Sequence, residues 1–110
     1  MANVFKNAVS ASVGTSAVDV YTAPSSTTST VIGCTVSNRT GSPINIDAQI
    51  TDTSASATVY LVKAAPIATG SSLVLIGGDQ KVVLETTDKL TITSDTATSA
   101  DVIVSVLESS

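Results

Sequence analysis

Apolar and polar residues alternate along most of this chain of 110 residues. The clearest stretch is residues 44–51, in which Ile44, Ile46, Ala48 and Ile50 alternate with polar residues. A period of two is typical of a β-strand with one buried face, whereas an amphipathic helix needs a period near 3.6. The pattern predicts about eight short strands, over residues 17–23, 30–38, 44–52, 57–64, 72–76, 81–85, 89–94 and 101–108.

Residues that favour turns separate these strands, for example Pro24, the run Gly41–Ser42–Pro43 and the run Gly77–Gly78–Asp79. Glycine permits positive φ, proline fixes φ, and Asp or Ser side chains bond to the nearby backbone. Short strands at about ten-residue spacing, with no helix between them, favour two packed antiparallel sheets. We therefore predict an all-β fold, an antiparallel β-sandwich of the jelly-roll or immunoglobulin-like type.

Alternation within the strands also predicts which side chains face the core. Cys34 is expected to share an inner face with Ile32 and Val36, where a thiol packs as a small, inert apolar group. The full set of predicted core residues is Ile32, Cys34, Val36, Ile44, Ile46, Ala48, Ile50, Leu73, Leu75, Val82, Leu84, Leu90, Ile92, Val102, Val104 and Val106.

The length predicts one domain with a core large enough to fold without disulfides or metals. We assign residues 17–110 to a single β-sandwich domain. Residues 1–16 alternate only weakly and contain the one Phe of the chain, in the pair Val4–Phe5. This segment is predicted to be either an N-terminal arm that reaches a neighbouring molecule or an edge strand of the chain's own sheet.

The composition excludes several kinds of chemistry. The chain has no His and one Cys, so it lacks a Ser-His-Asp or Cys-His catalytic group, an imidazole metal site and a disulfide framework. Most carboxylates fall in or beside predicted turns, and none has the dense spacing of a calcium-binding loop. The sequence therefore predicts a protein that is not an enzyme, with no catalytic residues, no metal site and no cofactor.

Charge and hydropathy limit the classes of partner. The formal net charge is −4, and the five basic residues are scattered, which argues against nucleic acid as a partner. No apolar run approaches the roughly 20 residues of a membrane-spanning helix, so no membrane partner is expected. No secretion signal is evident, and a single unpaired Cys34 fits synthesis in a reducing bacterial cytoplasm.

Some strands are apolar on both faces, and one apolar pair lies in an otherwise mostly polar or small-residue segment. Both patterns are expected where a strand contacts a partner. The scarcity of Trp, Tyr and Arg predicts many weak contacts between copies of a homo-oligomer rather than one strong contact. The residues predicted to make these assembly contacts are Val4, Phe5, Tyr60, Val62, Leu73 and Ile76.

Several runs resemble small structural proteins of tailed bacteriophages, especially phages of marine bacteria and cyanobacteria. The runs are Val20–Pro24, Thr30–Asn38, Tyr60–Ile67, Gly77–Glu85 and Val102–Glu108. The resemblance implies a non-enzymatic virion protein, such as a capsid decoration or cement protein or a neck or tail accessory protein. Its partners would be itself and other virion proteins, its location would be the virion, and it brings no catalytic or binding residues.

The sequence leaves a second function open, a host-adhesion or carbohydrate-binding β-sandwich module. Sugar sites usually stack rings on aromatic faces, and this chain offers only Phe5, Tyr21 and Tyr60. The aromatic content therefore favours the structural protein over the sugar-binding module.

Overall fold

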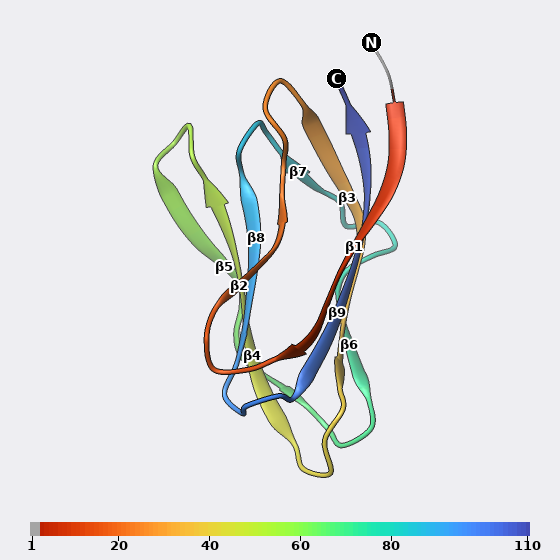
Figure 1. The fold of residues 1–110 in the computed structure, drawn as a ribbon, viewed down its shortest axis with the longest axis vertical. Helices are drawn as coiled ribbons and strands as arrows, with labels where there is room; N and C mark the ends of the chain where they lie inside the picture. The colour runs from red at the N-terminus through yellow and green to blue at the C-terminus, as the bar shows by residue number, and fades with distance from the viewer. Residues whose placement is uncertain (1–2) are drawn as a thin grey trace.

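The computed structural model describes residues 3–110, which form nine β-strands and no helix (Figure 1). The strands alternate along the chain with the turns that Gly, Pro, Asp and Ser favour. Their bounds are β1 (Asn3–Val13), β2 (Val18–Thr22), β3 (Thr28–Asn38), β4 (Ile44–Asp52), β5 (Ala57–Ile67), β6 (Ser72–Ile76), β7 (Val82–Leu84), β8 (Lys89–Ser94) and β9 (Ala100–Ser109).

The strands form two antiparallel sheets that face each other (Figure 1). The first sheet has the order β1-β9-β3-β6, with β7 also paired to β3, and the second has the order β2-β8-β4-β5. The predicted all-β antiparallel sandwich is confirmed. Neighbours in the chain such as β1 and β2, β3 and β4, or β8 and β9 lie in opposite sheets, which is the arrangement of a jelly roll.

The core lies between the sheets and contains the side chains that alternation predicts. On β4, Ile44, Ile46, Ala48 and Ile50 are all buried, as are Val102, Val104 and Val106 on β9. Other predicted positions, Leu73, Leu75 and Val82, are half-buried and pack against the core. Removing this apolar surface from water is the main favourable contribution to folding.

Ile32 is the exception among the predicted core residues. The pairing of β3 with β9 shifts by one residue between Val31 and Gly33. Val31 therefore points into the core and is fully buried, Ile32 is only half-buried, and Cys34 and Val36 point inward again. A bulge of one residue reverses the faces of a strand, so the prediction for Ile32 is wrong.

Residues 3–13 of the N-terminal segment form β1, the edge strand of the first sheet. β1 pairs with β9 from Asn3 opposite Ser109 to Val13 opposite Ala100, with a register shift between Ser10 and Val13. In this structure the segment therefore lies in the chain's own sheet. The first two residues of the predicted arm lie outside the described residues.

Cys34 gives a test of which β3 side chains face inward. Its side chain is 1% exposed, and burial raises the pKa of the thiol to about 12. We expect slow labelling by a thiol reagent in native buffer and fast labelling in denaturant. Cys34→Ser is expected to cost about 1–3 kcal/mol, because the hydroxyl would lie in an apolar core. Equal labelling rates in both conditions would contradict this orientation.

Candidate functional site

The six predicted assembly residues lie on three edge strands rather than in one site. Val4 and Phe5 are on β1, Tyr60 and Val62 on β5, and Leu73 and Ile76 on β6. β1 and β6 are at the two ends of the first sheet, and β5 is at one end of the second. The fold therefore presents separate candidate surfaces.

On β1, the two predicted anchors point to opposite faces. Phe5 lies opposite Leu107 and is 74% exposed, on the side of the first sheet that faces away from the core. Val4 lies opposite Glu108, whose side chain points toward the second sheet. A flat partner on the outer face would therefore contact Phe5 but not Val4.

On β5, Tyr60 is exposed and Val62 is half-buried opposite Ala48. The Nζ atom of Lys63 lies 4.7 Å from the centroid of the Tyr60 ring, which is the geometry of a cation–π contact. This contact covers part of the ring within the chain, and Tyr60 remains 48% exposed beside it.

On β6, Leu73 is half-buried, but Ile76 is 1% exposed and belongs to the core. The pairing of β3 with β6 shifts so that Ile76 lies opposite Cys34 and Val74 lies opposite Thr35. Val74 therefore takes the outward position. The prediction that Ile76 is an assembly contact is wrong, because this bulge turns its side chain inward.

Sequence reasoning missed several exposed apolar residues on the outer face of the first sheet. They are Val9, Val83 and Ile103, which lie on this face with Val74 of the run Leu73–Ile76, a run that is apolar on both strand faces. Val83 and Ile103 lie in the continuous apolar runs Val82–Leu84 and Val102–Val104, where alternation assigns only the flanking residues to the core. An apolar residue between two core positions was the signal that could have identified them.

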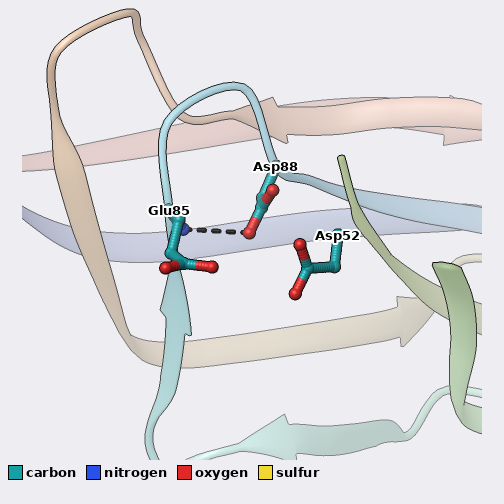
Figure 2. Close-up of side chains that lie close together, drawn as sticks. All are labelled: Asp52, Glu85 and Asp88. Carbon is teal, nitrogen blue, oxygen red and sulfur yellow. Dashed lines mark hydrogen bonds between the residues drawn. The ribbon is translucent and has the colours of Figure 1, made fainter. Parts of the chain in front are cut away.

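The fold also brings one carboxylate close to two others that are distant from it in the sequence. Asp52, Glu85 and Asp88 each contribute an oxygen, and these atoms lie within 4.8 Å of one another (Figure 2). Asp88 is 2% exposed; its Oδ1 accepts hydrogen bonds from the Thr53 N–H at 2.9 Å and the Thr53 hydroxyl at 3.2 Å, and its Oδ2 accepts one from the Glu85 N–H at 3.0 Å. This group was not predicted from the sequence.

These carboxylates form the group that could hold a cation among residues 3–110. Asp52 itself accepts hydrogen bonds from the Ser54 hydroxyl and the Ala55 N–H, which lower the pKa of its carboxyl. Asp88 joins the loop after β4 to the turn before β8. The hydrogen bonds thus give both residues a role in fixing loops.

A polar cluster joins the two sheets near the ends of β1 and β9. The Tyr21 hydroxyl on β2 lies 2.5 Å from Glu108 Oε2 on β9 and 2.7 Å from Ser29 Oγ on β3. Lys6 Nζ on β1 lies 3.1 Å from Glu108 Oε1. Burial and the nearby Glu108 raise the pKa of Tyr21 to about 12, and the hydrogen bond from Tyr21 lowers the pKa of Glu108.

The Tyr21 phenol predicts an alkaline limit to stability. In Tyr60→Phe, Tyr21 is the sole phenol, and its absorbance is expected to change near pH 12 rather than near its ordinary value of 10.0. A raised folded-state pKa means that its stabilisation is fully present below pH 10 and is lost as the pH rises through about 12. In the double variant Tyr60→Phe/Glu108→Gln, the absorbance change of Tyr21 should occur at a lower pH. If Tyr21 ionised near pH 10 while Glu108 is still present, the hydrogen-bonded cluster would be contradicted.

Residues 3–110 contain no helix of the length and apolarity needed to span a membrane.

Comparison with known proteins gives one similarity in fold. No family model and no curated protein matches the chain. A solved structure described as "Bacillus endospore appendages form a novel family of disulfide-linked pili" is similar, with a TM-score of 0.54 and 17% sequence identity. The match covers 96% of this chain and 86% of that chain. At this identity the similarity shows a shared fold alone.

The prediction of a bacteriophage virion protein is contradicted by this comparison. The solved structure that shares the fold belongs to a bacterial endospore appendage, and no comparison leads to a phage. A role in a virion, as a capsid decoration protein or a tail protein, therefore has no support. The segments behind the resemblance, such as Val20–Pro24 and Val102–Glu108, are strands and turns of the sandwich, so they carried information about the fold rather than about a particle.

Proposed function

We propose that this chain is a non-enzymatic structural protein that assembles with copies of itself through the free edge of β1. β1 is 11 residues long and is the terminal strand of the first sheet, hydrogen-bonded to β9 on one side. Its other side presents a row of backbone N–H and C=O groups. Such an edge can accept a strand from another molecule.

The other edge strands carry features that weaken strand addition. β5 contains Pro66, which lacks an N–H, and Ala64 with a positive φ of 52°, beside shifts in its pairing with β4. β2 and β6 have five residues each, and β7 has three. β1 has a register shift and Ser12 with a positive φ of 59° near its end, but Asn3–Ser10 pair with β9 without a shift. These residues include no proline and one charged side chain, Lys6. β1 is therefore the least protected of the edges, and this observation carries the proposal.

The shared fold supports the same proposal, because the similar solved structure is described as a pilus. That pilus is described as disulfide-linked, whereas the one cysteine of this chain is buried with a pKa raised to about 12. A buried thiol is unsuited to forming a bond with a neighbouring copy. The proposed assembly is therefore non-covalent.

The uses of the buried carboxylates support a role without catalysis. Asp88 and Glu108 are the two buried acids of residues 3–110, and each accepts hydrogen bonds that join parts of the fold. The chain also has no histidine, the residue that most often acts as a general base.

Sedimentation velocity over a range of protein concentrations tests this function. We expect species larger than one chain whose fraction grows with concentration. A single monomeric species at every concentration would contradict the proposal.

Proline substitution locates the contact on β1. Neighbouring residues of an antiparallel strand direct their N–H groups to opposite edges. Of Asn7→Pro and Ala8→Pro, one variant loses a hydrogen bond to β9 and the other loses a donor on the free edge. The variant with the lost donor on the free edge is recognised by its wild-type melting temperature, and we expect it to lose self-association. If that variant associates as strongly as the wild type, the contact between copies lies elsewhere.

A further inference from the structure

The outer face of the first sheet, the side away from the core, carries two rows of side chains that cross the whole sheet. In the first row, Val9 lies opposite Ile103, Ile103 opposite Thr35, and Thr35 opposite Val74. Val9 is 66% exposed, Val74 63% and Ile103 48%. Each position therefore presents methyl groups to solvent.

The second row likewise has three apolar residues and one Thr. Phe5 lies opposite Leu107, Leu107 opposite Thr30, and Thr30 opposite Val83. Phe5 and Val83 are exposed, and Leu107 is half-buried. Between the rows, Phe5, Ile32 and Ser105 line part of a surface hollow. The face therefore has both a projecting ring and a recess.

This face is almost free of charge. Among the outward-facing residues of β1, β9, β3, β6 and β7, Asp101 alone is charged, and it forms an ion pair with Arg39 at 3.2 Å. The outer face of the second sheet is different, because it includes Asp19, Asp47 and Lys89. The two outer faces of the sandwich are thus chemically distinct.

We infer that the outer face of the first sheet stacks against the same face of a second copy of this chain. This inference rests on the proposed self-association and adds a second contact surface to the edge of β1. The face is four strands wide and, along β9, ten residues long. With strands about 4.8 Å apart and a rise of about 3.3 Å per residue, its area is roughly 600 Å². Two such faces bury roughly 1,200 Å², above the roughly 1,000 Å² expected of a specific interface.

Charge favours a second copy as the partner. Each copy carries a net charge of −4, so most pairs of surfaces would bring like charges together. On this face the one charged strand residue, Asp101, is paired with Arg39, so two such faces meet with little repulsion. Sheets in face-to-face contact pack about 10 Å apart with interdigitated side chains. The exposed Phe5 ring and the hollow beside Ile32, which Phe5 itself helps to line, both lie on the surface that would meet the second copy.

A lysine in the middle of the face tests the contact. Ile103→Lys places a charge on each copy at the stacked surface, and like charges brought together there should raise the dissociation constant at least about tenfold. Gln49→Lys is the matched control, since Gln49 lies between the buried Ala48 and Ile50 on the outer face of the second sheet. It adds the same charge and should leave association unchanged.

Thiol labelling locates the contact without adding charge. Because Cys34 is buried, Ile103→Cys and Gln49→Cys each provide one accessible thiol. The labelling rate at position 103 is expected to fall as protein concentration rises, while the rate at position 49 stays constant.

The outcomes separate this inference from the proposed function. If the wild type associates but neither Ile103 variant differs from its Gln49 control, the face contact is wrong and the edge contact stands. If the wild type is monomeric at every concentration, both proposals fail. Loss of association in Ile103→Lys together with protection of Ile103→Cys supports the stacked face.

Discussion

A chain that starts at Ala17 is expected to lose cooperative folding, rather than to stay folded and lose association alone. β1 pairs with β9 along almost its whole length, and Val13 at its end is 2% exposed in the core. The backbone just beyond it is also used, because the carbonyls of Val13 and Gly14 accept hydrogen bonds from Ser99 and Ser94 at 3.0 Å and 2.9 Å. Truncation removes all of these interactions together.

The expected loss is a large fraction of the stability of the domain. Burial of Val13 alone is worth about 1.5–3 kcal/mol, each of the two backbone hydrogen bonds adds about 0.5–1.5 kcal/mol, and the pairing of β1 with β9 adds more. A domain of this size has about 5–15 kcal/mol in total. Circular dichroism during heating should therefore show a broad or absent transition.

Phe5→Ser in the full chain is the control for this truncation. Its side chain is largely exposed, so the melting temperature should stay close to that of the wild type. A truncated chain that melts cooperatively, at the temperature of the full chain, would instead mean that residues 1–16 act as a separable arm.

The strands were predictable because half-burial imposes a period of two on the sequence. The strands over residues 44–52, 72–76 and 89–94 have the bounds that alternation predicts. On β4 and β8 most side chains that face the core are apolar and alternate with polar neighbours, so the pattern records burial directly. On β6, residues 73–76 are all apolar, and the flanking Ser72 and Gly77 marked the strand instead. The edge strand β1 was harder to assign, since most of its side chains are exposed and it alternates weakly.

Ile32 and Ile76 were misplaced for a common physical reason. Both lie beside a register shift, one between Val31 and Gly33 and the other between Cys34 and Thr35. A bulge adds one residue on one strand and exchanges inner and outer faces beyond it. Where apolar residues occupy consecutive positions, the sequence is compatible with either face, and the partner strand decides.

The acidic group was missed because alternation within strands does not give strand order. Asp52 ends β4, whereas Glu85 and Asp88 bound the turn between β7 and β8. Pairing of β4 with β8 in the second sheet brings these segments together. Asp52 accepts hydrogen bonds from its own loop, whereas Asp88 also accepts them from a distant loop. The sequence does not distinguish these two kinds of turn aspartate.

Asp88→Ala is expected to destabilise the fold by about 3 kcal/mol, because three part-buried hydrogen bonds lose their acceptor. The donors are the Glu85 N–H, the Thr53 N–H and the Thr53 hydroxyl. Because Asp88 is only 2% exposed, water does not readily take the place of its carboxylate oxygens. The melting temperature should fall by more than about 10 °C.

Asp88→Asn separates the hydrogen bonds from the volume of the side chain. Its amide oxygen can accept from Thr53 or from Glu85, while its NH₂ group would meet an N–H donor on the other side. The melting temperature of Asp88→Asn should therefore lie between those of the wild type and Asp88→Ala. Asp52→Asn, at the half-buried neighbour whose partners are in its own loop, should change the melting temperature little.

The order of these three variants distinguishes a link between loops from a simple cluster of negative charge. If mutual repulsion of Asp52, Glu85 and Asp88 dominated, removing any one charge would stabilise the fold, and Asp52→Asn and Asp88→Asn would both raise the melting temperature. If hydrogen bonds dominate, Asp88→Ala falls furthest, Asp88→Asn is intermediate, and Asp52→Asn stays near the wild type. The short distances from Asp88 to the backbone N–H groups of two loops, 2.9 Å and 3.0 Å, favour the second order.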